Sequence, residues 1–395
     1  MTEIFAGDRT RKRLLFGATL TLSLSLALTL LAGTGTAGRS NSTVVKVMTR
    51  NIYLGADLTP GIEASSPSEF AAANGQILRD VDTNNFPVRA RGLAREIIST
   101  RPDLVGLQEV ALWRTNETPN LGPALNGDPK TARAVKYDFL KLLMRRLNRG
   151  DRRYRIVKVQ REFDFEAPAD YNGTPGDSDG GPTEQALMPD AEINGRLTMR
   201  DAIIARVGAR VVTRNAKGDN FDNLYTPSVS GVPVPVTRGW VSVDAKVRGS
   251  RLFHFVNTHL EAFDNGAKEA QARELIARGG PARSRLPVIL VGDLNSDDNT
   301  VSATNGDRRA YNAIKRFGFR DVATENPMSC CLDVSILTVA GGGQRSDFDH
   351  HIDHILTDTP RKVRKLGARV TGLRPVNGFW DSDHAGVLST LRIRR

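Results

Sequence analysis

The chain has 395 residues, 39% of them hydrophobic and 25% charged, which is ordinary for a soluble globular protein and long enough for a sizeable core. Its net charge of +11 suits a polyanionic partner such as nucleic acid or an anionic membrane surface, with solubility as the alternative reason. The two cysteines, Cys330 and Cys331, are adjacent, which excludes a disulfide framework and a cysteine-based metal site. Their state stays open between a strained bond to each other, free thiols and pairing between molecules. Because two adjacent cysteines cannot form a metal site, any metal must be held by oxygen or nitrogen ligands.

The N-terminal segment has the three parts of a secretory signal in the usual order. A basic block at residues 9–13 precedes an apolar run at residues 14–32, and the small residues Gly35, Thr36 and Ala37 follow. We therefore expect residues 1–37 to be a signal peptide and the protein to be secreted. An uncleaved membrane anchor is the alternative, because the run is long enough to span a bilayer. Residues 1–37 carry four basic and two acidic side chains, so the remaining chain carries +9.

Apolar strand-like segments alternate with helical patterns along the rest of the chain. Strands are predicted at residues 44–52, 103–110, 154–159, 200–207, 239–247, 251–258, 287–291, 351–356 and 385–393, and helices at residues 88–100, 134–148, 266–277 and 308–317. Two polar segments, residues 112–129 and 167–195, are predicted to be surface insertions. Because no repeat or linker divides the chain, one layered α/β domain is predicted at residues 44–395.

Polar side chains stand where the predicted strands begin or end. They are Asn51, Glu109, His259, Asp293, Asn295, Asp353, His354, Asp383 and His384. Side chains at strand ends converge while the sheet holds them rigidly, so they are typical of a ligand site. Carboxylates and an amide are the ligands that Mg²⁺ prefers, and a cation with a protonated histidine stabilises charge on a phosphodiester under attack.

Six short segments, in this order, resemble the endonuclease/exonuclease/phosphatase superfamily, which includes DNases, abasic-site endonucleases and neutral sphingomyelinases. They are residues 48–51 (Met-Thr-Arg-Asn), 107–110 (Leu-Gln-Glu-Val), 257–260 (Asn-Thr-His-Leu), 291–295 (Val-Gly-Asp-Leu-Asn), 352–355 (Ile-Asp-His-Ile) and 382–384 (Ser-Asp-His). The resemblance implies a four-layer α/β sandwich, two packed mixed sheets flanked by helices. It also implies metal-dependent hydrolysis of phosphoester bonds.

The same resemblance implies a role for each matching residue. Glu109 is the main metal ligand, Asn51 assists the metal or the phosphate, and Asp383 is a further carboxylate of the metal site. Asp293 aligns or deprotonates the attacking water, and Asn295 holds a phosphate oxygen or places Asp293. The remaining roles fall to three residues: His384 stabilises developing charge, Asp353 orients His384, and His259 is the second histidine, a candidate acid for the leaving group. The expected cofactor is Mg²⁺, with Mn²⁺ or Ca²⁺ as alternatives.

Substrate and partners remain open at this point. Nucleic acid is the first expectation because of the basic charge. A phospholipid is the alternative, with Phe379 and Trp380 as candidates for membrane contact or for packing under the site. A catalytically silent binding protein on the same fold is the third hypothesis. Tyr53 and its neighbours differ from the Trp-Asn opening common among the nucleases, which puts a nuclease substrate in doubt. We expect a monomer without an obligate protein partner.

Two weaker assignments complete the predicted site. Arg200 lies where the superfamily uses a residue that touches phosphate, and a surface salt bridge is its alternative role. His350, His351 and His354 form a cluster that suits a transition metal. One or more of these histidines could instead line the mouth of the active site.

Overall fold

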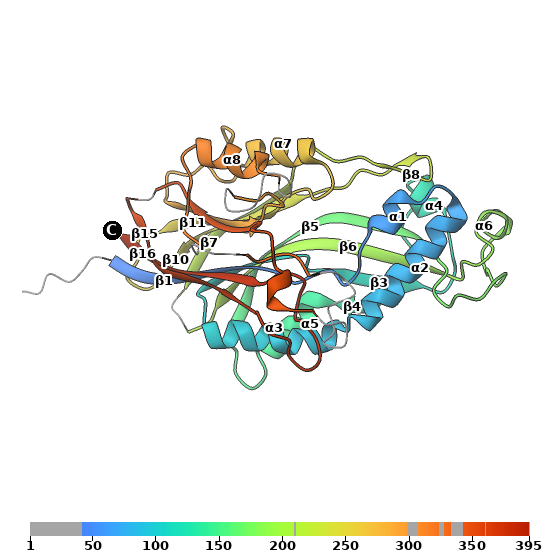
Figure 1. Ribbon diagram of the computed structural model, residues 1–395, viewed down its shortest axis with the longest axis horizontal. Helices are drawn as coiled ribbons and strands as arrows, with labels where there is room; N and C mark the ends of the chain where they lie inside the picture. Colours follow the sequence, from blue (N-terminus) through green and yellow to red (C-terminus); the bar gives the residue numbers. More distant parts are fainter. Residues whose placement is uncertain are drawn as a thin grey trace, which may run out of the picture. The chain divides into compact units, whose positions relative to one another are not determined.

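Two mixed β-sheets packed face to face form the centre of the structure, a computed structural model (Figure 1). The structure describes residues 42–208, 211–298, 307–323, 328–332, 343–359 and 361–394. The first sheet has the strand order β15-β16-β1-β2-β6-β3-β4 with β5 paired to β6, and the second has the order β13-β14-β12-β11-β10-β7. A small hairpin, β8–β9, lies apart from both.

The strand bounds are as follows. They are β1 Ser42–Asn51, β2 Leu104–Gln108, β3 Leu112–Asn116, β4 Ala134–Asp138, β5 Tyr154–Ala169, β6 Ile193–Arg206, β7 Val212–Asn220, β8 Ser228–Val229, β9 Val232–Pro233, β10 Gly239–Lys246, β11 Phe253–His259, β12 Val288–Asp293, β13 Arg320–Asp321, β14 Asp353–Thr357, β15 Val363–Thr371 and β16 Gly386–Arg394. The helices are α1 Thr59–Glu63, α2 Pro67–Thr83, α3 Phe86–Thr100, α4 Gly122–Leu125, α5 Phe139–Leu147, α6 Pro182–Leu187, α7 Asn265–Ile276, α8 Arg309–Arg316 and the 3₁₀ turn Arg345–Asp347.

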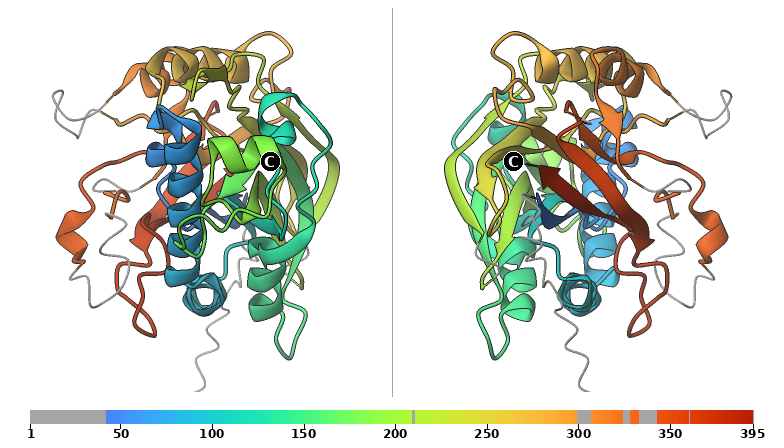
Figure 2. Two further views of the ribbon diagram at one scale, coloured as in Figure 1. Left: turned by 90° about the vertical axis from the view of Figure 1, so that its right-hand side faces the viewer. Right: turned by 90° about the vertical axis from the view of Figure 1, so that its left-hand side faces the viewer.

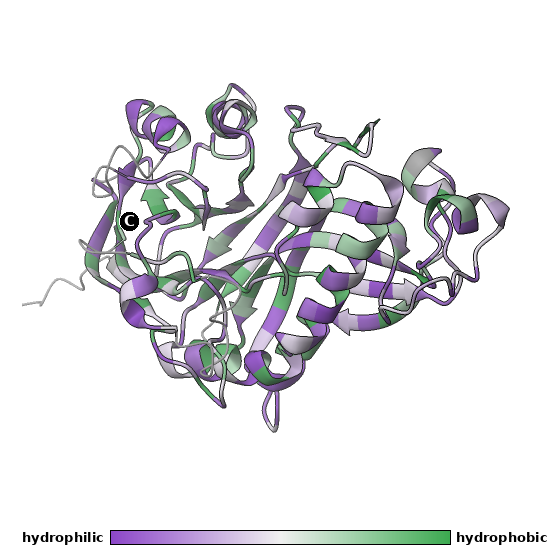
Figure 3. Ribbon diagram, turned by 45° about the vertical axis from the view of Figure 1, so that its right-hand side comes forward, coloured by the Kyte–Doolittle hydropathy of each residue, from purple (hydrophilic) through white to green (hydrophobic). Residues whose placement is uncertain are grey.

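Helices cover the outer face of each sheet, which gives four layers. The two side views place α7 and α8 on the outer face of the second sheet, and α3 and α5 on the outer face of the first sheet (Figure 2). Hydrophobic residues gather on the strands and on one side of the helices (Figure 3). The predicted four-layer α/β sandwich, with two mixed sheets flanked by helices, is confirmed.

Three hydrophobic cores hold these layers together. Val47 of β1 packs between the two sheets, whereas its neighbour Met48 packs against α3 and α5. Adjacent strand residues point to opposite faces, so β1 contributes to two cores at once. The third core joins Leu290 of β12 to Leu275 of α7 and Ile314 of α8.

The strand register brings the predicted site residues to one edge. In the first sheet, β1 and β2 are parallel with Asn51 beside Gln108. In the second, β11 and β12 are parallel with His259 beside Asp293, and the antiparallel β14 sets Asp353 opposite Asp293. The ends of four strands and the start of a fifth therefore meet, although the residues are far apart in the sequence.

Two predicted elements need correction. The predicted helix at residues 134–148 is strand β4 followed by α5, because residues 134–138 pair with β3 and Asp138 accepts a hydrogen bond from Lys141 N at the helix start. The predicted insertion at residues 112–129 begins with β3, which pairs with β6. The segment looked polar because Trp113 is one of few apolar residues in it, and the Trp113 indole donates to Leu54 O.

The predicted signal peptide, residues 1–37, lies outside the described residues. Within the described part of the chain, no helix is long and apolar enough to cross a membrane.

Candidate active site

Asn51 links two carboxylates that come from different sheets. Its Nδ2 donates to Glu109 Oε1 over 2.9 Å and to Asp293 Oδ2 over 3.1 Å, while its Oδ1 accepts from Tyr53 N. Glu109 follows β2 with a φ of 55°, a left-handed conformation that turns the chain sharply at the sheet edge. The amide therefore holds both carboxylates at one point between the sheets.

His384 is oriented by a carboxylate on its far side. Its Nδ1 lies 2.9 Å from Asp353 Oδ2, which also accepts from Ser329 Oγ over 2.7 Å. Its Nε2 lies 3.6 Å from Asp293 Oδ2 and 3.4 Å from Asn51 Nδ2. The His384 carbonyl accepts from Arg50 Nη1. This arrangement aims Nε2 at the point where Asn51 and Asp293 meet.

His259 and Asn295 also lie against Asp293. His259 Nε2 lies 3.5 Å from Asp293 Oδ2, and Arg238 Nη1 lies 3.2 Å from His259 Nδ1. Asn295 N donates to Asp293 Oδ1 over 2.8 Å, and Asn295 Nδ2 lies 3.1 Å from His259 Nε2. Asp293 is thus surrounded by groups that fix both of its oxygens.

Burial and neighbouring charge move the pKa values of these groups apart. Burial raises the pKa of Asp293 to about 6 and that of Asp383 to about 7. Burial alone would lower the pKa of His384, but the carboxylates of Asp353, Asp293 and Asp383 raise it well above its usual value. Burial, with Arg238 and His384 nearby, lowers the pKa of His259 well below its usual value. His384 is therefore cationic, whereas His259 is neutral.

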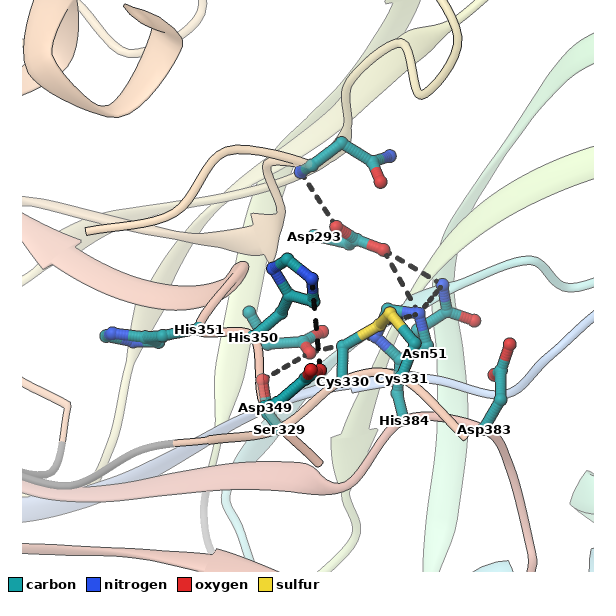
Figure 4. Close-up of a disulfide and its surroundings, with 12 residues drawn as sticks. Asn51, Asp293, Ser329, Cys330, Cys331, Asp349, His350, His351, Asp383 and His384 are labelled. Carbon is teal, nitrogen blue, oxygen red and sulfur yellow. Dashed lines mark hydrogen bonds and ion pairs between the residues drawn. A yellow bond between two sulfur atoms is a disulfide. The ribbon is translucent and has the colours of Figure 1, made fainter. Parts of the chain in front are cut away.

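The adjacent cysteines lie against this centre. Cys330 and Cys331 are joined by a disulfide, and Cys330 Sγ lies 3.4 Å from His384 Nε2. Asn51, Asp293 and His384 converge beside the disulfide, while His351 points away from them (Figure 4).

One cavity joins these residues to an apolar space. It has a volume of about 310 Å³, and Glu109, Asp293, Asp383 and His384 line one part of it. This volume lies near the lower end of small-molecule sites. Most of the other lining residues are hydrophobic and come from α1, α2, β5, β6 and the β8–β9 hairpin.

Comparison with known proteins shows the family of the chain. Residues 73–384 match the model of the Endonuclease/Exonuclease/phosphatase family. The chain belongs to this family.

Several solved structures are similar to this chain, and one of them, a family protein, shares the fold. A family protein from Bacteroides thetaiotaomicron is 15% identical, with a TM-score of 0.51, and the match covers 90% of this chain and 99% of that one. The Bacteroides thetaiotaomicron mannosyl-6-phosphatase Bt3783 is 15% identical, with a TM-score of 0.46 and coverage of 88% and 99%. D. rerio TDP2, complexed with a single-strand DNA product, is 17% identical, with a TM-score of 0.46 and the same coverage. No curated protein matches the sequence.

Enzymes of the endonuclease/exonuclease/phosphatase family generally depend on a divalent metal ion, and the residues here fit one. Glu109 is close enough to Asp383 for its negative charge to raise the pKa of Asp383. Two carboxylates held at one cavity wall are the oxygen donors that Mg²⁺, Mn²⁺ or Ca²⁺ prefers. Asn51 Oδ1, in contrast, accepts from the backbone of Tyr53, and the Asn51 amide acts as a donor between carboxylates.

The structure brings the other predicted site residues together, but it does not bring Arg200 to the site. Its Nε donates to Val110 O, and its Nη2 donates to Ala111 O and pairs with Asp138 over 2.7 Å. Arg200 does not line the cavity. We therefore correct its predicted contact with phosphate to a structural role: its donors tie β6 to the start of β3 and to the cap of α5.

The three clustered histidines and the aromatic pair, Phe379 and Trp380, do not lie at the mouth of the site. His350 contacts Asp297 over 2.9 Å, and His354 lies between Asp321 and Ser296 O. His351 and His354, with Asp321, offer atoms within 4.8 Å of one another that could hold a metal, but they do not line the cavity. Trp380 is buried against Phe348, so a membrane-contacting pair of exposed aromatics is absent at this described segment.

Sequence reasoning missed Arg238, Glu162 and Asp201. Arg238 is buried, lines the cavity and pairs with Glu261 over 3.5 Å. Burial raises the pKa of Glu162 to about 8, and burial with the nearby Glu162 raises that of Asp201 well above its usual value. The pairing of Gly239 with His259 could have located Arg238, but that register is visible only in the folded sheet.

Proposed function

We propose that the protein is a divalent-metal-dependent phosphodiesterase in which water attacks phosphorus. The observation that carries the proposal is the meeting of Asp293, the Asn51–Glu109 pair and the cationic His384 at one end of a cavity. A base, a charge-stabilising cation and a metal-binding carboxylate are the groups that this hydrolysis needs.

Each residue has a distinct task in this reaction. Asp293, placed by Asn51 and by the Asn295 backbone, orients the water and accepts its proton. His384 Nε2 carries the positive charge toward the phosphate oxygens, and Asp353 holds it in that orientation. His259 faces the same space as a neutral imidazole, so it can hydrogen-bond to the leaving oxygen, which takes its proton from water. Glu109 and Asp383 would hold the metal, which supplies Lewis-acid stabilisation of charge on phosphorus-bound oxygen.

Two substrates are supported by different observations. The charge of +9 that remains without residues 1–37 favours extracellular nucleic acid. The apolar wall of the cavity favours a phosphoester with an apolar group, as in a phospholipid. We propose secretion on the basis of residues 1–37, with a membrane-anchored form as the alternative.

The proposed activity is tested with bis(4-nitrophenyl) phosphate, a diester without chain or base preference. We expect hydrolysis with Mg²⁺, Mn²⁺ or Ca²⁺, none with EDTA, and a loss of about 10³-fold in Asp293→Asn, within the range of general acid–base contributions. Asp151→Asn is the matched control, because Asp151 is 81% exposed and outside the site. Metal-independent turnover, or equal rates in both variants, would contradict the proposal. No turnover of any diester would favour a silent binding protein.

A further inference from the structure

The apolar part of the cavity is enclosed by segments that are far apart in sequence. α1 packs against α2 and against β8, and α2 packs against β5 (Figure 1). Phe70 of α2 and Val229 of β8 belong to one hydrophobic cluster, together with Val234, which follows β9. All three line the cavity while they are at most 8% exposed. The residues of the cavity wall therefore belong to the hydrophobic core and also face the cavity.

Aromatic side chains from β5 continue this wall. Phe163 and Phe165 have ring centroids 5.6 Å apart, and Phe165 lies 6.1 Å from the ring of Phe70. Phe163 lies in an irregular part of β5, where the register against β6 shifts between Arg161 and Asp164. Bulges of this kind redirect a side chain near functional sites.

Two polar side chains along this wall are engaged with the protein, whereas the Tyr53 hydroxyl, which lines the same cavity, is buried without a hydrogen-bond partner. Asn74 Nδ2 donates to Pro168 O, and Asp57 Oδ1 accepts from Thr59 N. Among the lining residues, all of which the structure describes, Arg238 is the one lysine or arginine. It is buried, pairs with Glu261 and contacts His259.

This wall fits an aliphatic chain and does not fit a polynucleotide. A nucleic-acid strand needs several cations along its successive phosphates, even where aromatic side chains stack on its bases. An aliphatic chain needs only apolar surface, and each buried methylene contributes about 0.8 kcal/mol, or a factor of about four. Apart from Arg238, none of the described lysine and arginine side chains lies on this wall.

We propose that the cavity is a binding site for the aliphatic chain of an amphipathic phosphodiester, whose phosphate lies at Asp293 and His384. The proposal rests on the proposed phosphodiesterase activity and adds the class of substrate. The chain occupies the space between α1, α2, β5 and the β8–β9 hairpin, and the phospholipid class supplies such substrates.

The test uses alkyl 4-nitrophenyl phosphates with chains of one, four, eight and twelve carbons, below their aggregation concentrations. We expect kcat/KM to rise up to about fourfold per methylene until the cavity is full. Val234→Trp places an indole in the cavity, so the rise with chain length should flatten in this variant. Val212→Trp is the matched control, because Val212 is 62% exposed on β7, and it should keep the wild-type rise.

The outcomes separate the chain site from the activity. Hydrolysis of the methyl ester without any gain from longer chains would overturn the chain site and leave the activity standing. Faster hydrolysis of thymidine 4-nitrophenyl phosphate than of the octyl ester would also overturn it, in favour of nucleic acid. If no ester is hydrolysed, calorimetry with dodecylphosphocholine decides: binding that Val234→Trp weakens and Val212→Trp retains supports the site, and absence of binding overturns it.

Discussion

The charge of His384 depends on the carboxylates around it. In the buried centre a histidine would lose its proton, but Asp353, Asp293 and Asp383 raise its pKa well above the usual value. Asp353 also fixes the ring through Nδ1, and Ser329 fixes Asp353. The same carboxylate therefore sets both the orientation and the protonation of the group that faces phosphate.

Replacing Asp353 by Asn should uncouple these two effects. We expect Asp353→Asn to lower kcat by about 10²-fold or more, since charge stabilisation is lost. The basic limb of the pH–rate profile should also move to lower pH, because His384 loses the charge that holds its proton. Ser329→Ala, which removes one hydrogen bond to Asp353 but no charge, should lower kcat less and leave the limb in place. An unmoved limb in Asp353→Asn would show that Asp353 only positions the ring.

Glu162 gives the stability of the protein a pH dependence. Burial raises its pKa in the folded state to about 8, from an ordinary value of 4.5. Between these values the folded protein binds more protons than the unfolded chain, so stability falls as pH rises from about 4.5 to 8. Glu162→Gln removes this group and should make the protein more stable than wild type at pH 8.5, by on the order of 2 kcal/mol.

Urea unfolding at pH 5.5 and pH 8.5 measures this difference. The gap between Glu162→Gln and wild type should widen at the higher pH, while the exposed Glu63→Gln should show no widening. A constant gap at both values would mean that Glu162 is ionised throughout, with Arg238 as its counter-ion.

At the scale of elements, close packing makes a glycine inside helix α2 more favourable than the alanine that helix propensity prefers. Gly75 lies inside α2, where glycine normally costs about 1 kcal/mol relative to alanine. A Cβ at this position would meet the carbonyl oxygen of Asp170 at 1.6 Å, so α2 and the end of β5 could not keep their approach. The backbone of Asp170 instead donates to Ala71 O across the same contact.

We therefore expect Gly75→Ala to destabilise the protein by about 1–3 kcal/mol, the usual range for an overpacked core. Because α2 and β5 line the cavity, activity on long-chain esters should fall further than activity on the methyl ester. Ala72→Gly, at an exposed position of the same helix, should cost only about 1 kcal/mol. Thermal unfolding would count against this packing argument if Gly75→Ala were as stable as wild type.

For the whole molecule, the site is a property of the packed sheets. Asn51 and Glu109 come from the first sheet, and His259, Asp293 and Asp353 from the second. The core between the sheets, with Val47, Phe255 and Ile289, therefore holds the two halves of the site together.

The N-terminal segment is tested in a bacterial host that secretes proteins. We expect a released protein that begins after Ala37, identified by intact mass, because the apolar run at residues 14–32 is read as a cleavable signal. Leu26→Arg together with Leu28→Arg should keep the protein inside the cell. Recovery of the full-length chain in the membrane fraction would favour the anchor instead.

The sequence by itself determined the fold class and the polar residues of the strand ends. Asn51, Glu109, His259, Asp293 and His384 could be found because a buried strand has a local pattern, and a polar residue at its end breaks that pattern. The resemblance of six short segments assigned the family. Residues 134–138 were misread because strand pairing with β3, which is not local, outweighs the helical pattern that continues into α5.

Only the tertiary structure decided what surrounds these residues. Arg238 reaches His259 through the register of β10 and β11, and Arg200 is diverted from the cavity by carbonyls and by Asp138. The apolar cavity arises from α1, α2, β5, β6, the β8–β9 hairpin and loop residues between them, none of which shows it alone. Such features depend on which distant segments become neighbours, and that is settled by the order and register of the sheets, which a local sequence pattern does not contain.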